Sequence, residues 1–418
     1  MLKVFNTLSR QIEQFRPREN GKVRMFTCGP SVYRQPHIGN YRTFLYEDLL
    51  QRYLEYLGYD VTRLISLTDI EDKAIVEAEK EHVSVKELAE RNRRIFLEDS
   101  ELLRIKSPTY SACMMACSST AVEEVAKLIK NLLEKDYAYY YKHKGRRNAY
   151  YDPLKFEDFG KLSKLDMRQW PRKKRRFHKD TYPGNRWNRG DFILWHGYKE
   201  GDLDYWDTEI GKGRPAWNIQ DAATIAKYLG FTVDIACGGI DNLTRHHDYT
   251  IAILEGVSGE EFAHYWFHGQ HVFVDGKKMS KSKGNVYYPS DLVRMGYTGE
   301  HIRFFLIYGH YRKRLNFTLK KMKRASQKLD LFKNTIRSLE KAKSEESSRK
   351  AKNLVDDLLL AFENNMNNDL NVKDAFDTLF STLKKLDNLR RREKLSYKDA
   401  STAADKFRKI DNVLQIIY

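Results

Sequence analysis

Two short segments, far apart in the chain, carry side chains suited to binding phosphate. The first, Pro36 to Asn40 (PHIGN), stands between the apolar run 23–26 and a stretch whose apolar residues recur at helical spacing. The N-terminus of a helix presents free N–H groups and the positive end of the helix dipole to a phosphate. Gly39 allows a ligand to approach the backbone closely, and His37 and Asn40 can donate hydrogen bonds. This turn is therefore a candidate phosphate site, although a histidine at a helix start more often only packs or caps.

The second segment, Lys278 to Ser282 (KMSKS), lies within DGKKMSKSKGN and is closed by Gly284. Lysines and serines on a short loop of this kind suit a cationic clamp for the triphosphate tail of a nucleotide. The stretch between the two segments is long enough for most of a doubly wound domain. The two segments can therefore converge at one edge of a sheet.

Two further polar stretches follow apolar runs that are typical of buried strands. Thr68 to Lys73 (TDIEDK) comes after residues 60–67, at the carboxyl end where open α/β sheets bind their ligands. Gly238-Gly239-Ile240-Asp241 comes after residues 231–236. A glycine pair there lets a nucleoside approach, and the carboxylate of Asp241 can meet the ribose hydroxyls. In isolation, the same residues would favour an ordinary tight turn.

The elements that must position these residues follow from hydrophobic periodicity. Residues 1–22 are expected to form an edge strand and a charged loop ahead of the central strand. A long helix and the strand 60–67 then complete a βαβ unit. Further helices are predicted near 75–103, 121–135 and 217–225 and from His246 onward, with short strands and turns at 137–160 and an apolar strand at 190–195. Residues 318–418 show helical apolar spacing, with a polar break at 341–352.

The composition limits the class of protein. The chain has 418 residues and 41% hydrophobic content, so two or three globular domains are expected, and no apolar run approaches the length of a membrane span. The N-terminal segment does not resemble a secretory signal. The net charge of +17 suits either solubility alone or a polyanionic partner such as RNA. The basic run Arg172–Arg176 should form a solvated loop that could contact a phosphate backbone.

Four cysteines are few for so long a chain and indicate a reducing compartment. Cys113 and Cys117 lie close together, but no second pair is nearby at zinc-finger spacing. We therefore expect both to be buried small apolar residues. Cys237 is expected to be a buried thiol, with a role as a metal ligand as the alternative.

PHIGN followed by KMSKS resembles the signature pair of the class I aminoacyl-tRNA synthetases. FTCGPSVYRQPHIGNYRTF, LTDIEDK, GDFILW, GRPAWNIQD, CGGIDNLTRHHD and GHYRKRLNFT resemble, in the same order, blocks of the cysteinyl-tRNA synthetase family. The resemblance is close over residues 1–330. It implies an α/β fold: a Rossmann-type doubly wound parallel sheet with an inserted connective domain, followed by a C-terminal α-helical bundle.

The resemblance also implies where the domains lie. The catalytic domain would occupy 1–110 and 191–285, with the inserted connective domain at about 111–190. A stem-contact region would follow at 286–330 and the helical bundle at 331–418. The small domain that reads the anticodon in these synthetases has no evident counterpart before the chain stops at Tyr418.

By resemblance, the catalytic residues are His37 and Asn40 near the α-phosphate, and Lys278 and Lys281 at the leaving pyrophosphate. Asn40 stands where the family has the last histidine of its HIGH motif, and an asparagine still donates a hydrogen bond. The ATP-binding residues are expected to be these four together with Gly29, Gly39, Gly239, Asp241 and Ser280. ATP and Mg²⁺ are the implied cofactors.

The implied amino-acid pocket consists of Cys28, Thr68, Trp217, Asp221, His246 and Thr250. In the family, a zinc ion held by two cysteines, a histidine and a glutamate binds the substrate thiolate. Residue by residue, Cys28 and His246 match two of these ligands, whereas Asp221 replaces the second cysteine and Thr250 replaces the glutamate. Cys28, Asp221 and His246 could form a three-ligand zinc site with an open position. A weakened or absent metal is the alternative.

Three functions remain open from the sequence. The chain could charge tRNA with an amino acid, cysteine by resemblance, through an aminoacyl-adenylate. It could instead hand the activated amino acid to a small amine or a protein, or be an inactive RNA-binding relative. The intact motifs favour an enzyme. The basic residues favour the acceptor arm of tRNA as partner, held by the 172–176 loop, the helix near 320–324 and the segment His310-Tyr311-Arg312. A cytoplasmic location without membrane attachment is expected.

Overall fold

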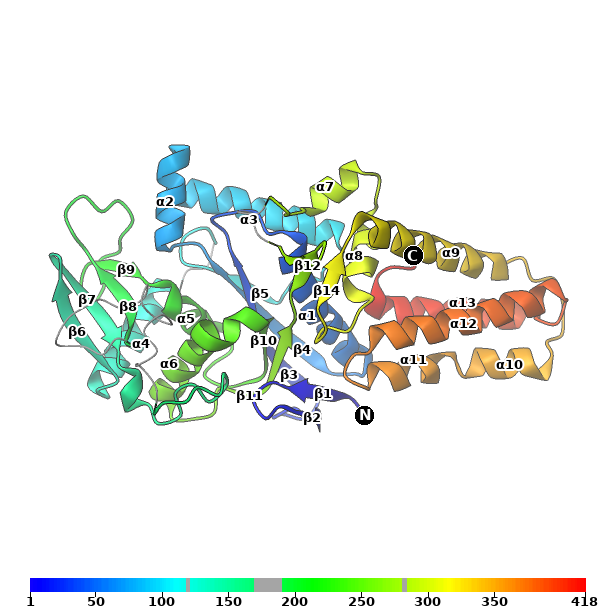
Figure 1. Cartoon of the computed structure of the whole chain (residues 1–418). Helices are drawn as coiled ribbons and strands as arrows, with labels where there is room; N and C mark the ends of the chain where they lie inside the picture. The colour runs from blue at the N-terminus through cyan, green and yellow to red at the C-terminus, as the bar shows by residue number, and fades with distance from the viewer. Residues whose placement is uncertain (118–120, 169–189, 280–283) are drawn as a thin grey trace.

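A computed structural model of the chain describes residues 1–117, 121–168, 190–279 and 284–418 (Figure 1). Its centre is a five-stranded parallel sheet in the order β11-β10-β3-β4-β5. The strands are β3 (Lys22–Ser31), β4 (Asp60–Thr68), β5 (Tyr110–Ala112), β10 (Val233–Gly239) and β11 (Ala263–Gly269). Strand order reverses between β3 and β10, which is where a doubly wound sheet opens a ligand crevice. The predicted α/β fold class is confirmed.

Helices cover both faces of this sheet because its strands are apolar on both sides. The helix α1 (Ile38–Tyr56) follows β3 and contacts the sheet as well as the helices α8 (Gly299–Ile307) and α13 (Tyr397–Leu414), so it lies between the sheet and the bundle (Figure 1). The other helices near the sheet are α2 (Asp72–Glu81), α3 (Val85–Leu102), α5 (Trp217–Tyr228) and α6 (Asp248–Ser258). The helical region predicted at 75–103 is broken, because His82 adopts a left-handed conformation and Ser84 caps α3.

A separate antiparallel sheet is inserted between β5 and β10. Its order is β6-β7-β8-β9, from β6 (Ala138–His143), β7 (Arg146–Tyr151), β8 (Phe192–Gly197) and β9 (Gly213–Pro215). The helix α4 (Val122–Glu134) precedes it, and the short 3₁₀ helix η1 (Pro153–Lys155) follows β7. The domain boundary expected at residue 190 falls inside this sheet, between β7 and β8. Pairing of β8 with β7 is a long-range contact that local sequence pattern does not reveal.

Two smaller sheets complete the catalytic part. At the N-terminus, β1 (Lys3–Asn6) and β2 (Gln11–Gln14) pair only with each other among the described strands, so the edge strand expected there is instead a hairpin. This hairpin docks on β11 through a hydrogen bond from the Thr7 N–H to the Trp266 carbonyl. The second small sheet joins β12 (Val272–Val274), β13 (Lys277–Lys278) and β14 (Leu315–Phe317), and β13 ends at Lys278, the first residue of the KMSKS segment.

The C-terminal part is helical, as its apolar spacing predicts. The helices are α9 (Leu319–Leu339), α10 (Arg349–Asp356), α11 (Leu358–Met366), α12 (Val372–Arg391) and α13, and α7 (Pro289–Arg294) and α8 link them to the catalytic part (Figure 1). The predicted polar break contains the loop before α10. Within the described residues, no helix has both the length and the apolarity needed to cross a membrane.

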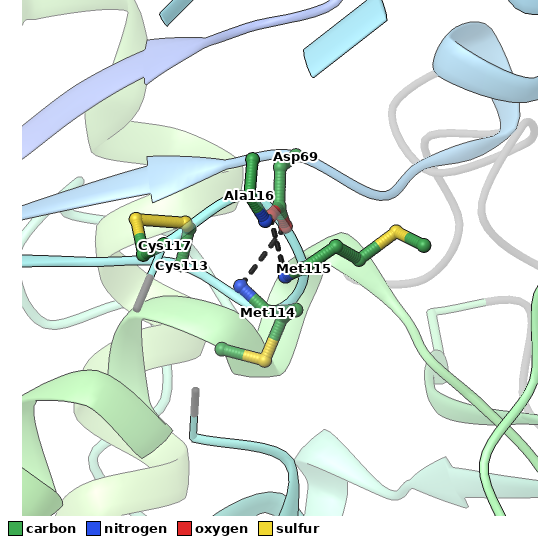
Figure 2. Close-up of a disulfide and its surroundings, with 6 residues drawn as sticks. All are labelled: Asp69, Cys113, Met114, Met115, Ala116 and Cys117. Carbon is green, nitrogen blue, oxygen red and sulfur yellow. Dashed lines mark hydrogen bonds between the residues drawn. A yellow bond between two sulfur atoms is a disulfide. The ribbon is translucent and has the colours of Figure 1, made fainter. Parts of the chain in front are cut away.

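Cys113 and Cys117 depart from the sequence-based expectation. Both are buried, but their sulfurs form a disulfide, so they are not free apolar side chains (Figure 2). The chain turns tightly after β5 and brings the two Cα atoms to 5.6 Å, within the range that a disulfide spans. Cys28 and Cys237 are buried free thiols.

Candidate active site

A cavity of about 1040 Å³ opens at the carboxyl ends of β3, β4 and β10. This is the switch point of the sheet, so residues that follow different strands meet there. Most of the residues singled out in the sequence line it: Cys28, Gly29, His37, Gly39, Asn40, Thr68, Trp217, Gly239, Asp241, His246 and Lys278. Ser280 and Lys281 lie outside the described residues. Asp221 and Thr250 are the exceptions, because their side chains are buried behind the residues that line the cavity.

The PHIGN turn is built by a reciprocal cap at the start of α1. The Asn40 N–H donates to His37 Nδ1 at 3.2 Å, and the His37 N–H donates to Asn40 Oδ1 at 3.0 Å. The cap orients both side chains at the positive end of the helix dipole. The Asn40 side-chain amide nitrogen has no hydrogen-bond partner within the described chain. It is therefore available to an anionic oxygen in the cavity.

Glycines keep the cavity open where the backbone comes close to other groups. A Cβ at Gly29 would stand 2.4 Å from the Ser66 carbonyl oxygen, so no side chain fits there. A Cβ at Gly239 would stand 2.7 Å from Asp241 Oδ1 and displace that carboxylate. The strand end β10 thus presents bare backbone beside an exposed carboxylate, as nucleoside recognition requires.

Three candidate metal ligands converge at the inner end of the cavity. One ligand atom from each of Cys28, Asp221 and His246 lies within 4.8 Å of the others. His246 Nε2 is 2.6 Å from Asp221 Oδ2, and Asn242 Nδ2 lies 3.1 Å from Cys28 Sγ. Trp217 stacks on the His246 ring with centroids 5.4 Å apart and 9° between the planes.

The electrostatics of this cluster follow from burial and from Asp221. Burial, and then the neighbouring Asp221 carboxylate, raise the pKa of the Cys28 thiol well above its usual range. Burial by itself lowers the pKa of His246, but the Asp221 carboxylate, together with Glu71 and Asp241, outweighs burial and leaves the pKa raised. Asp221 Oδ1 is buried and has no hydrogen-bond partner among the described residues. The cluster therefore offers a sulfur, a carboxylate and an imidazole nitrogen, and one carboxylate oxygen has no hydrogen-bond partner among the described residues. This set of ligand atoms suits Zn²⁺.

Thr250 does not take the place of a metal ligand. Its side chain is fully buried, and its hydroxyl donates to the His246 backbone carbonyl at 3.0 Å. It supports the turn that carries His246 and does not line the cavity. That turn, η3 (Leu243–His247), is a π-helical segment directly after the 3₁₀ turn η2 (Ile240–Asn242). Wide turns of this kind are frequent at functional sites because they shift one side chain out of helical register.

Several lining residues were missed from the sequence. They are Tyr33, Arg34, Asn242, Arg245, Gln270 and His271. Gln270 and His271 follow β11 directly, and the rule that ligands gather at the carboxyl ends of parallel strands could have found them. Nothing in the local pattern marks Asn242, which lies in η2 and contacts Cys28 on the distant strand β3.

In the segment His310-Tyr311-Arg312, which was expected to contact the acceptor stem, Tyr311 is buried and the Arg312 side chain is partly exposed. Tyr311 is 1% exposed and its hydroxyl donates to Asp369, and Arg312 Nε donates to the same carboxylate at 2.6 Å. These side chains bind the helical bundle to the catalytic part. The basic run Arg172–Arg176 lies outside the described residues.

The chain matches known proteins along most of its length. Residues 14–327 match the catalytic domain of the class I (C) tRNA synthetases. The cysteine–tRNA ligase of Brachyspira hyodysenteriae is 37% identical over 385 residues, covering 91% of this chain and 79% of the relative. That of Clostridioides difficile is 36% identical over 423 residues, covering 100% of this chain and 88% of the relative.

Solved structures agree on the fold. The methionyl-tRNA synthetase of Mycobacterium tuberculosis bound by methionyl-adenylate superposes with a TM-score of 0.68 at 15% identity, covering 95% of this chain and 90% of that one. A leucyl synthetase in a ternary complex with tRNA, from Agrobacterium radiobacter, gives 0.70 at 12% identity, covering 97% and 85%. Together with the sequence matches and the motif residues gathered in one cavity, this places the chain in the class I tRNA synthetase family, among relatives that are cysteine–tRNA ligases.

Proposed function

We propose that this enzyme activates cysteine with ATP and transfers it to the 3′ end of a tRNA. Its kinship with cysteine–tRNA ligases favours tRNA over a small amine or a protein as the acceptor. The observation that carries the proposal is one cavity lined both by the PHIGN turn and by Cys28 and His246, the two members of the Cys28–Asp221–His246 cluster that reach it. An inactive RNA-binding relative would have no need to keep both.

In the first step, the amino-acid carboxylate attacks the α-phosphate of ATP in line, and pyrophosphate leaves. Negative charge develops on the phosphate oxygens, so donors aimed there lower the barrier more than they aid binding. His37 and Asn40, at the start of α1, are assigned to the α-phosphate, and Lys278 with Lys281 to the pyrophosphate. Gly239 and Asp241 would bind the ribose, and Mg²⁺ would accompany the phosphates.

In the second step, a ribose hydroxyl at the 3′ end of the tRNA attacks the adenylate carbonyl and AMP leaves. The acceptor arm must therefore enter the same cavity. We assign the contacts that hold it to the cationic surface of the chain, whose net charge is +17. A cytoplasmic location belongs to this proposal, because charging supplies translation.

The inner cluster would select the amino acid. Cys28, Asp221 and His246 would hold one Zn²⁺ and leave a position open for the substrate. When bound, the ion supplies a Lewis acid that prefers a thiolate to the hydroxyl of serine. Trp217, stacked on the His246 ring, would keep that ring in place.

The test is amino-acid-dependent ATP–pyrophosphate exchange combined with metal analysis. We expect exchange with cysteine only, charging when tRNA is added, and about one equivalent of zinc per chain. Cys28→Ala should lose the metal, whereas Cys237→Ala, which removes a buried thiol on the same sheet, should keep it. Exchange driven by a different amino acid, in protein without zinc, would contradict the assignment of cysteine.

A further inference from the structure

The disulfide Cys113–Cys117 lies beside the active site but takes no part in the proposed reaction. It closes a tight loop whose middle residues point their backbone N–H groups at one carboxylate (Figure 2). Asp69 Oδ1 accepts from Met114 at 3.0 Å, and Asp69 Oδ2 accepts from Met115 at 2.5 Å and from Ala116 at 2.7 Å. Consecutive N–H groups converging in this way form an anion-binding nest.

Asp69 depends on this nest. Its side chain is 1% exposed, and no ion pair to it occurs within the described residues. Burial raises the pKa of the carboxyl, and the three backbone hydrogen bonds oppose that rise. A buried carboxylate without these donors would have to take up a proton or move toward water. The geometry of the loop therefore sets the position of the Asp69 carboxylate.

Asp69 in turn positions one wall of the cavity. It lies between Thr68, at the end of β4, and Glu71, both of which line the cavity. The Ile70 carbonyl accepts from Gln220 Nε2 at 2.6 Å, so this wall is held at two points. One point is α5, which also carries Asp221 of the ligand cluster, and the other is the loop that the disulfide closes.

We propose that Cys113–Cys117 is a reversible thiol–disulfide modification site that sets the position of Thr68–Glu71 through Asp69. The oxidised form holds the nest and the cavity wall in place. Reduction opens the loop, spreads the three N–H groups and weakens binding of the amino acid. In a reducing compartment, a protein disulfide more often forms transiently in catalysis or redox sensing than permanently to stabilise the fold. The effect on binding, but not the coupling of the loop to Asp69, rests on the proposed function.

A dithiol can reduce the Cys113–Cys117 disulfide in two exchange steps. Its thiolate attacks Cys117 Sγ, because Cys117 is 8% exposed while Cys113 is fully buried. The S–S bond breaks, and Cys113 leaves as a thiolate that takes up a proton. The second thiol of the reductant then attacks the mixed disulfide and releases the Cys117 thiol. Two electrons and two protons pass to the protein, and the reductant ends as its own disulfide.

The first measurement is a count of thiols in the full chain, alkylated after denaturation. Protein treated with diamide should show two thiols, Cys28 and Cys237, and protein treated with dithiothreitol should show all four. Four thiols in the diamide-treated protein would overturn the proposal.

The second measurement is hydrogen exchange on both forms without substrate, which is independent of the proposed function. Reduction should speed exchange at 114–116 and at 68–71 by about tenfold, because both segments lose a shared constraint. The Cys113→Ser/Cys117→Ser variant should exchange like the reduced protein in both treatments, and Cys237→Ala should respond as the wild type does. Faster exchange at 114–116 with 68–71 unchanged would disprove the coupling.

The third measurement separates positioning from general stability. In ATP–pyrophosphate exchange, Asp69→Asn should raise the KM for the amino acid about fivefold or more with kcat changed less than about twofold, as expected for lost positioning of a binding wall. Thiol counts should show that this variant still forms the disulfide. Equal falls in kcat and kcat/KM, or an unchanged KM, would count against Asp69 as the link.

Discussion

Single side chains at this cavity either face the ligand space or hold other groups in place. Lys278 is exposed on β13 and lines the cavity, whereas its neighbour Lys277 is exposed on the same strand but does not line it. Asp221 and Thr250 are buried behind the wall and act on His246. The two groups should respond differently to substitution, because only the first meets the charge that develops during the reaction.

We predict that Lys278→Ala slows adenylate formation by on the order of 10²-fold, the usual cost of removing one preorganised charge from a developing anion. Lys277→Ala is the matched control and should stay within about twofold of the wild type, since an exposed surface substitution is usually mild. The measurement is ATP–pyrophosphate exchange at saturating ATP. Equal losses in both variants would show that general basicity, and not the placement of Lys278, matters.

Glu47 is a second residue with a distinct electrostatic role. It is 2% exposed on α1, and its Oε1 has no hydrogen-bond partner among the described residues. Burial raises its pKa to about 8, and Arg63 opposes the shift only in part. The folded state therefore binds a proton between pH 4.5 and 8 that the unfolded state has lost.

This proton linkage makes stability fall with rising pH. Because the folded pKa is raised, the contribution of Glu47 is fully present below about pH 4.5 and is lost as pH rises to about 8. Glu47→Gln should remove this slope, so its free energy of unfolding relative to the wild type should improve by a few kcal/mol across that range. Urea unfolding at several pH values measures it. Glu101→Gln, at an exposed site on α3, should retain the wild-type slope.

At the level of elements, Arg42 joins α1 to the loops around β12. Its guanidinium is 1% exposed and donates to the carbonyls of Gln270, His271, His310 and Lys313. The first two of these residues line the cavity. The planar Arg42 guanidinium thus fixes the cavity wall at Gln270 and His271 against α1, the helix that follows the PHIGN turn.

Arg42→Lys should lower the free energy of unfolding by about 2–4 kcal/mol, because an ammonium cannot reach all the carbonyls and leaves buried acceptors unpaired. Arg94→Lys, on the exposed face of α3, is the control and should change it by less than about 0.5 kcal/mol. Urea unfolding with a single probe is sufficient. A loss no larger than that of the control would mean that the four carbonyls find water or other donors.

Across the whole molecule, buried ionic contacts join the catalytic part to the bundle. Arg303 on α8 and Asp48 on α1 form a fully buried pair at 2.6 Å, and Arg303 Nε also donates to the Leu414 carbonyl at the end of α13. Asp369, between α11 and α12, binds Tyr311, Arg312 and the Phe5 N–H. Because these contacts bridge both parts, we expect the parts to unfold together.

Arg303→Met should cost about 3–5 kcal/mol, since it leaves the Asp48 carboxylate buried beside fewer cations. Adding Asp48→Asn should recover part of this loss by removing the stranded charge. Burial raises the pKa of Asp48, but Arg303 and other neighbours outweigh it and leave the pKa lowered. The advantage of the wild type should therefore be present above about pH 4 and shrink as pH falls below it. Urea unfolding of the single and double variants from pH 3 to 7 tests both points.

The family, the order of the main elements and most of the cavity lining could be predicted from the amino-acid sequence. Local patterns carry that information: apolar periodicity predicts α1 and β4, and the PHIGN turn needs only its own neighbours to form its cap. Residues at the carboxyl ends of parallel strands could be assigned to one edge without coordinates.

Features that depend on contacts between residues distant in sequence could not be predicted in this way and are evident from the fold. Pairing of β7 with β8, burial of Tyr311 against Asp369 and the contact of Asn242 with Cys28 each join segments that no local pattern connects. Asp221 could be named as a candidate ligand, but its place behind the wall follows from how α5 packs on the sheet. Cys113 and Cys117 were visible as a pair, yet a spacing of four residues suits a helix or a loop equally. Whether two sulfurs meet depends on the path of the backbone, and the fold sets that path.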